Sequence, residues 1–180
     1  MTFDLQPRLL GERLELRPLT PGDFEALHRA ASDPLIWEQH PQSDRHERAV
    51  FQRYFDSAIE SRGAFAIIDR SSGRIIGSSR YCNLKPAESE VEIGWTFLER
   101  AYWGGATNGE LKQLMVDHAL RFVERVVFVV GEHNRRSQMA LRKIGATYRD
   151  RTRGTLVDGT AIDSLVFVIT REQWRRSEHR

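Results

Sequence analysis

The chain has little of what would restrict its location or its chemistry. Its 180 residues include a single cysteine, Cys82, so no disulfide can form within the chain and nothing implies an oxidising compartment. The longest wholly apolar run, residues 126–130, is far too short to span a bilayer. No continuous apolar signal region opens the chain, because Asp4, Gln6 and Arg8 interrupt it. We therefore expect a cytoplasmic protein with no membrane partner.

The chain also lacks an excess of charge of one sign. A formal net charge of +2 is too small to indicate nucleic acid as the main partner. Arginines do gather near residues 135–153, where a solvated face and an anion-attracting patch are both open interpretations. No group of histidine and cysteine residues has metal-ligand spacing, so no metal is expected. His118 falls on the apolar side of a predicted helix and is expected to be buried and hydrogen-bonded rather than catalytic.

Alternating strand and helix patterns run through the sequence instead. Apolar alternation predicts seven strands, at residues 13–17, 64–69, 74–84, 89–98, 126–130, 147–153 and 161–170. Helical spacing predicts four main helices, beginning near Thr20, Asp44, Asn108 and Arg135. Short connections between residues 64 and 98 indicate an antiparallel meander. The order β-α-α-β-β-β-α-β-α-β-β predicts one α+β (mixed α/β) domain without repeats or linkers. The charged segment 171–180 is expected to be a partly frayed end.

The most informative stretch is the small-residue loop of residues 102–110, Tyr-Trp-Gly-Gly-Ala-Thr-Asn-Gly-Glu, between a predicted strand and a predicted helix. Small residues let backbone N–H groups approach a ligand closely, and a helix N-terminus adds about half a positive charge. The loop therefore predicts a phosphate or pyrophosphate site. A tight strand-to-helix connection without a ligand is the alternative interpretation.

Several motifs, in this order, resemble the GCN5-related N-acetyltransferase superfamily, and most closely its branch of ribosomal-protein N-terminal acetyltransferases (the RimJ/RimL type). They are Arg-Leu-Glu-Leu-Arg-Pro-Leu at 13–19, Glu-Ile-Gly-Trp at 92–95, the loop itself, His-Asn-Arg-Arg-Ser at 133–137 and Lys-Ile-Gly-Ala at 143–146. The resemblance covers nearly the whole chain. It implies one N-acetyltransferase domain over residues 1–180, with residues 1–8 and 175–180 as frayed ends, and a mostly antiparallel sheet carrying helices on both faces. It also implies acetyl-coenzyme A (acetyl-CoA) as co-substrate and an amine as acceptor.

The resemblance implies a set of cofactor-binding residues. Backbone amides of the loop would bind the pyrophosphate, at Trp103, Gly104, Gly105, Ala106, Thr107, Asn108 and Gly109. The backbone of Gly94, Trp95 and Thr96 would pair with the pantetheine arm and offer an N–H to the oxyanion. Asn134 would contact the same arm, cap the following helix, or do both.

The loop departs from the superfamily pattern, which is Gln or Arg, two residues, Gly, one residue, then Gly or Ala. Trp103, Ala106 and Asn108 occupy those positions. Ala106 has a Cβ, so it avoids the φ > 0 conformations that glycine accepts. Asn108 is an alternative cap for the helix.

Two residues are candidates for proton transfer. The resemblance places Ser137 near the departing thiolate, which it would protonate; a solvated serine is the alternative. Strand alternation assigns Val91, Ile93, Trp95 and Phe97 to one face and Glu90, Glu92, Gly94 and Thr96 to the other. A carboxylate on an inner sheet face is costly unless it is paired or lines a cleft. Glu92 is therefore the first candidate for the general base, directly or through water, with an ion pair as its alternative role. Glu90 is the second candidate.

Trp37 and His40 lie in the segment that lines the acceptor pocket in this family, although Trp37 equally suits the edge of the core. The expected function is transfer of acetyl from acetyl-CoA to a primary amine. A non-catalytic acyl-CoA sensor with the same fold is the alternative. The acceptor stays open among a peptide N-terminus, a polyamine, an antibiotic and an amino-acid derivative, and so does the formation of a homodimer.

Overall fold

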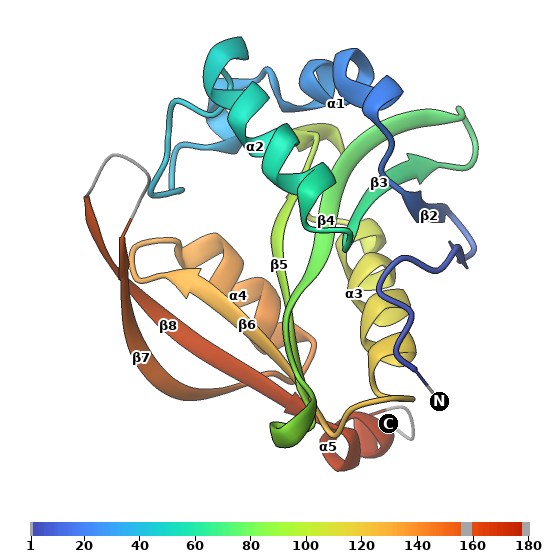
Figure 1. Cartoon of the computed structure of the whole chain (residues 1–180), viewed down its shortest axis with the longest axis vertical. Coiled ribbons are helices and arrows are strands. Elements are labelled where there is room, and N and C mark those ends of the chain that lie inside the picture. Colours follow the sequence, from blue (N-terminus) through green and yellow to red (C-terminus); the bar gives the residue numbers. More distant parts are fainter. Residues whose placement is uncertain (1, 156–159, 178–180) are drawn as a thin grey trace.

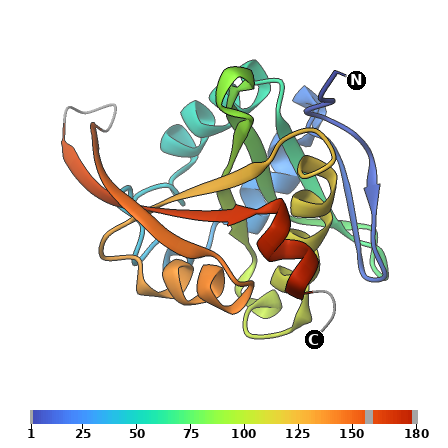
Figure 2. The same cartoon turned by 90° about the horizontal axis from the view of Figure 1, so that it is seen from below.

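A computed structural model describes residues 2–155 and 160–177 (Figures 1 and 2). Within these residues an eight-stranded sheet is combined with five α-helices. The strands are β1 (Leu9–Leu10), β2 (Leu14–Pro18), β3 (Ala64–Asp69), β4 (Arg74–Lys85), β5 (Glu90–Leu98), β6 (Arg125–Gly131), β7 (Thr147–Thr155) and β8 (Ala161–Thr170). The helices are α1 (Phe24–Ala31), α2 (Arg48–Glu60), α3 (Ala106–Ala119), α4 (Arg135–Lys143) and α5 (Arg171–Ser177).

The sheet has the order β1-β2-β3-β4-β5-β6-β8-β7, and every neighbouring pair is antiparallel except β5 and β6. This confirms the expected mixed α/β fold with a mostly antiparallel sheet. The parallel pair joins only Glu90 to Arg125, Val91 to Val126 and Glu92 to Val127. Beyond these residues the two strands diverge, as Figure 1 shows. The divergence leaves the second half of β5 without a strand on that side.

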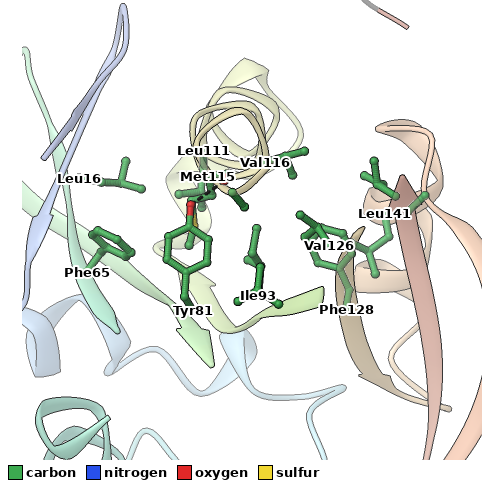
Figure 3. Close-up of a cluster of buried hydrophobic side chains, with 14 of the residues drawn as sticks. Leu16, Phe65, Tyr81, Ile93, Leu111, Met115, Val116, Val126, Phe128 and Leu141 are labelled. Carbon is green, nitrogen blue, oxygen red and sulfur yellow. Dashed lines mark hydrogen bonds between the residues drawn. The ribbon is translucent and has the colours of Figure 1, made fainter. Parts of the chain in front are cut away.

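One face of the sheet packs against α3 and α4. Aliphatic side chains dominate this cluster, and Phe65, Tyr81, Ile93 and Phe128 contribute from four strands (Figure 3). Tyr81 is 1% exposed, and its hydroxyl donates to the Met115 carbonyl, so its polar atom is satisfied inside the core. This cluster links the strands on both sides of the β5–β6 divergence to the same helices.

The opposite face packs against α1 and α2. Its cluster is rich in aromatic rings, with Trp37, Phe51, Tyr54, Phe55 and Phe97 all buried. Helical spacing on α2 brings Phe51, Tyr54 and Phe55 to the sheet, as the apolar stripe in the sequence predicts. The two helices therefore cover the half of the sheet that precedes the divergence.

A β-bulge interrupts β5 in the middle of the predicted strand. Trp95 has φ +57°, and the register to β4 shifts between the Arg80–Gly94 and Ser78–Phe97 pairs. Strict alternation is therefore wrong beyond Gly94. Phe97 joins the α1/α2 cluster, whereas Thr96 points to α3 and accepts a hydrogen bond from Lys112. The bulge aims Gly94 and Trp95 to the same side of the sheet.

Both ends of the described chain pack onto the fold. Phe3 stacks on Phe122 and lies edge-on to Tyr81, while His118 Nε2 bonds to the Asp4 carbonyl at 2.8 Å. His118 is thus buried and hydrogen-bonded, as predicted. The segment from residue 171 forms α5, a helix that the sequence interpretation did not include. The short strand β1 is a second element that the sequence interpretation did not include. No helix among the described residues is long and apolar enough to cross a membrane.

Candidate active site

The divergence of β5 and β6 is the centre of the candidate site. Glu92 is the last residue of β5 that pairs with β6, and Gly94, Trp95 and Thr96 follow where β6 has moved away. The bulge at Trp95 turns backbone groups out of the regular ladder at this point. Free backbone donors and acceptors along an unpaired strand edge suit an extended, amide-containing ligand. The three residues predicted to contact the pantetheine arm therefore lie together at the opening.

The small-residue loop leads into α3, which begins at Ala106 with Gly105 as N-cap. Asn108 lies inside the first turn, so the alternative role of Asn108 as the cap is wrong. Gly105 has no side chain that could cap the helix. The backbone N–H groups in the first turn of α3 are therefore left for another acceptor. Gly104 has φ +72°, and a Cβ at Gly104, Gly105 or Gly109 would meet no atom within 4 Å. The start of α3 is therefore open to a phosphate group.

Trp103 contributes differently from the rest of the loop. Its backbone N–H already donates to the Arg100 carbonyl, and its indole N–H donates to the Leu98 carbonyl. The Arg136 guanidinium stacks 3.9 Å from the centre of its ring. Arg136, on α4, thereby connects the two sides of the β5–β6 opening. Trp103 holds the loop in place through its ring.

The carboxylate of Glu110, the last residue of the motif, forms hydrogen bonds within the fold. Its Oε1 accepts the backbone N–H groups of Arg13 and Leu14, at 2.8 and 3.0 Å. A Cβ on Gly11 would collide with this oxygen at 2.1 Å. Glu110 therefore ties α3 to the turn before β2, which explains a glycine there.

The N-terminus of α4 faces the opening from the β6 side. Asn134 is 8% exposed, and its Oδ1 accepts the Ser137 N–H at 3.1 Å, so it caps α4 as one of its predicted roles requires. Ser137 is half-buried in the first turn of the helix. The cap fixes the position of Ser137 relative to the end of β6.

The two carboxylates of β5 have opposite environments. Glu90 is 4% exposed and forms ion pairs with Arg149 at 2.5 Å and Arg125 at 3.4 Å. Burial alone would raise the pKa of Glu90, but the hydrogen bond and charge of Arg149 outweigh it, and its pKa is lowered. The ion pair considered for Glu92 thus belongs to Glu90.

Glu92, in contrast, forms no ion pair within the described chain. Its Oε2 accepts a hydrogen bond from Asn83 at 2.8 Å. Burial raises the pKa of Glu92, and the nearby charge of Glu90 adds to this rise. A raised pKa makes a carboxylate a stronger base. Its Oε1 lies 3.0 Å from the position of a Cβ on Gly94, directly beside the opening.

Trp37 and His40 lie on the α1/α2 side of the sheet. Trp37 is 2% exposed, and its indole N–H donates to the Ala31 carbonyl at 2.8 Å, so its ring is part of the core. His40 packs edge-on against Trp37. Burial, followed by the charge of Arg45, lowers the pKa of His40 to about 3, and the imidazole is therefore neutral at pH 7.

Three buried cationic residues near the opening were missed by the sequence interpretation: Arg45, Arg80 and Lys112. Lys112, on α3, donates to Thr96 Oγ1 at 3.0 Å, and burial lowers the pKa of its ammonium to about 8. Arg80 could have been found from the sequence, because it is a charged residue at a core-facing position of a predicted strand. No sequence signal marked Arg45, because it lies in a loop with no hydrophobic periodicity. No cluster of metal-ligand side chains occurs in residues 2–155 and 160–177.

A sequence model of the acetyltransferase (GNAT) domain matches residues 13–147, three quarters of the chain. The chain therefore belongs to the GNAT acetyltransferase family. It is an acetyl-CoA-dependent acyltransferase, since this family takes acetyl-CoA as donor.

Solved structures share the fold. A GCN5-related N-acetyltransferase from Brucella melitensis superposes with a TM-score of 0.83 at 21% identity, over 94% of this chain and 81% of that one. Spermidine N-acetyltransferase from Vibrio cholerae, in complex with CoA and spermine, gives 0.70 at 14% identity over 92% and 99%. Mycobacterium smegmatis RimJ, in complex with CoA-disulfide, gives 0.67 at 21% identity over 89% and 83%. At these identities the likeness shows the fold.

Proposed function

We propose that this protein is a single-domain N-acetyltransferase that transfers acetyl from acetyl-CoA directly to a primary amine. The observation that carries the proposal is the short β5–β6 pairing of three residues. The start of α3, which no side chain caps, lies on one side of the opening, and Glu92, which forms no ion pair among the described residues, lies where the two strands separate. Such an arrangement brings an anion site, an amide-binding strand edge and a base to one opening.

The donor is held by backbone groups. We propose that Gly104, Gly105, Ala106, Thr107, Asn108 and Gly109 contact the pyrophosphate, with Trp103 as the anchor of this loop. First-turn amides and the positive end of the α3 dipole both favour a bound anion. Gly94, Trp95 and Thr96 extend along the pantetheine arm, and Asn134 approaches it from α4.

Proton transfer falls to Glu92 and Ser137. Glu92 accepts the proton that the amine loses as it attacks, directly or through one water, and its raised pKa suits this task. Ser137 donates a proton to the departing thiolate; a thiol has a pKa near 8.5, so a modest acid suffices. A backbone N–H at the bulge donates to the oxygen that gains charge during the attack. His40 forms part of the wall of the acceptor side, and Trp37 supports it from the core.

The RimJ-like branch is the more specific assignment that we propose, because its motifs occur in order along this chain and RimJ shares the fold. A non-catalytic acyl-CoA sensor is less favoured, because a half-buried carboxylate with a raised pKa and no ion pair has no evident use in a binding module.

Calorimetric titration with acetyl-CoA, followed by a thiol-release assay over a panel of amines, tests the proposal. We expect binding and turnover. Absence of acetyl-CoA binding would refute both functions, and binding without thiol release for any amine would favour the sensor.

Gly104→Val tests the loop. A β-branched residue at φ +72° is strained, by about 1–3 kcal/mol, so the loop will shift and acetyl-CoA affinity will fall about tenfold. Gly154→Val, in exposed β7, is the matched control and leaves the affinity unchanged. Equal affinities for the two variants would place the phosphates elsewhere.

A further inference from the structure

Two arginines without carboxylate partners are buried together on the α1/α2 side of the candidate site. Arg45, just before α2, is 4% exposed, and Arg80, on β4, is 3% exposed. Both guanidinium groups lie against the same two rings, those of Tyr54 and Trp95, at 4.4 to 5.5 Å from the ring centres. Neither takes part in an ion pair within the described residues, although buried charges are normally paired. The cluster therefore has an uncompensated positive charge.

Both arginines also keep unused hydrogen-bond donors. The Nε atoms of Arg45 and Arg80 are buried and have no partner. Arg80 is fixed by its other nitrogens, which donate to the Ser57 and Tyr54 carbonyls of α2 at 3.2 and 3.4 Å. Arg45 Nη2 donates to Gln42 Oε1 at 3.0 Å. Each guanidinium is thus held in place while its Nε–H has no acceptor. Buried donors rarely remain unsatisfied in proteins, so these two N–H groups need an explanation.

His40 adds a further donor. Its Nδ1 accepts the Gln42 backbone N–H at 2.9 Å, so the proton of the neutral ring is on Nε2. Nε2 faces Arg45 Nη1 at 3.2 Å, which places two donors against each other. An acceptor that reached both atoms would resolve this conflict. The cluster therefore contains N–H groups of His40, Arg45 and Arg80 that lack an acceptor, and an anion would supply one.

The cluster lies next to the proposed point of acetyl transfer. Arg80 pairs with Gly94 in the β4–β5 ladder, and the Arg80 guanidinium stacks 4.4 Å from the centre of the Trp95 ring. Tyr54 closes the arrangement by donating to the Trp95 carbonyl at 2.9 Å. Trp95, 45% exposed, is the member of the cluster that meets solvent. An anion bound to Arg80 would therefore lie beside the bulge.

We propose that Arg45 and Arg80 bind a carboxylate of the acceptor, which makes the substrate a small amine carrying its own carboxylate, of the amino-acid type. This inference rests on the proposed acetyl transfer and narrows its acceptor, and it sets aside the ribosomal-protein N-terminus that the RimJ-like branch implies. A carboxylate suits the site because it accepts several hydrogen bonds at once and neutralises one of the two buried charges. Polyamines and polycationic antibiotics are disfavoured, since they would bring further positive charge to two unpaired arginines.

Matched substrate pairs test this inference. The thiol-release assay compares each common amino acid with its carboxamide, and includes spermidine. We expect the best acid to exceed its own amide by about tenfold or more in kcat/KM, because charge-assisted hydrogen bonds are lost. The carboxamide has the less basic amine, so any bias from amine protonation opposes the expected result. An amide or spermidine that is used as well as the best acid would overturn the inference while leaving the acetyltransferase function standing.

Substitution of single arginines tests whether Arg45 and Arg80 cause the preference for the acid over the amide. Arg45→Gln is expected to raise KM for the acid about tenfold, to leave kcat unchanged, and to leave KM for the amide within about twofold. Arg80→Gln, whose arginine also holds α2, is used only where its thermal unfolding matches the parent protein. Arg48→Gln, an exposed arginine of α2 paired with Glu25, is the control and retains the preference for the acid. Equal losses for acid and amide in Arg45→Gln would contradict carboxylate binding.

A binding measurement separates this inference from the proposed function. Calorimetry with CoA-loaded protein compares N-acetyl amino acids with their amides, and it needs no turnover. Binding of an N-acetyl amino acid that weakens in Arg45→Gln would support the anion site even if no amine were acetylated. Absence of any preference for the acid form in this measurement would overturn the inference.

Discussion

The two faces of the central sheet are filled with different kinds of side chain. Toward α3 and α4, the buried cluster is mostly aliphatic and its Tyr81 hydroxyl is satisfied, although Glu110 Oε2 on α3 has no hydrogen-bond partner. Toward α1 and α2, aromatic rings surround two buried arginines whose Nε atoms have no partner. Unsatisfied polar groups lower stability. The first face mainly stabilises the fold, whereas the two buried arginines of the second cost stability and fit the recognition role that we propose for them.

Leu111→Ala gives the largest expected effect on this comparison. Leu111 is fully buried on the α3 face, so the variant leaves a cavity and lowers the free energy of unfolding by about 2–5 kcal/mol. Denaturant titration measures it. Leu35→Ala, at a residue that is 45% exposed, is the control and changes stability by less than about 0.5 kcal/mol. A loss below about 1 kcal/mol for Leu111→Ala would show that this face adapts more readily than we infer.

Lys112 is a charged exception on the α3 face, and its effect depends on pH. Its pKa is about 8 in the folded protein and 10.5 in the unfolded chain, because burial disfavours the charged form. The unfolded chain therefore binds more protons between pH 8 and 10.5. The stability of the parent protein rises with pH across this window, by up to about 3 kcal/mol relative to Lys112→Met. Denaturation of both proteins at pH 7 to 10.5 measures it, with exposed Lys143→Met as control. Parallel pH profiles would contradict the lowered pKa.

Glu92→Gln tests the chemistry at the junction of the two faces. Loss of the base lowers kcat about a hundredfold and alters the rise of the rate with pH, while acetyl-CoA affinity is unchanged. Steady-state kinetics from pH 6 to 10 and calorimetry give the two quantities. Glu88→Gln, at an exposed carboxylate that pairs with Lys85, serves as control. An unaltered pH profile would remove Glu92 from this role.

Arg45→Met has the smallest expected effect and bears most directly on the α1/α2 face. The variant loses the hydrogen bond to Gln42, but it also removes an unpaired buried charge. We therefore expect the free energy of unfolding to change by less than about 1 kcal/mol or to rise, by denaturant titration at pH 7. A loss above about 2 kcal/mol would mean that Arg45 serves folding rather than recognition.

The sequence predicts most of the fold because periodicity is a local property. β3 and β8 have the predicted bounds, and the helix-start loop is where the small residues indicate. The sequence did not predict the bulge at Trp95, because nothing in a run of alternating residues marks an extra residue. The predicted faces of Trp95, Thr96 and Phe97 were therefore wrong. Glu90 and Glu92 look alike in sequence. The approach of Arg149, from 59 residues away, and of Arg125 on β6 separates their roles.

The bulge also limits how this strand can vary between related proteins. Deleting Trp95 would only remove the bulge and would keep Phe97 and Leu98 on their present faces, whereas deleting a single residue outside the bulge, between Glu90 and Leu98, would exchange the faces on one side of the deletion. A substitution at the same position changes one side chain only. We therefore expect natural variation in β5 to consist of replacements at constant length or of loss of the bulge residue, with other insertions and deletions confined to the turns on either side.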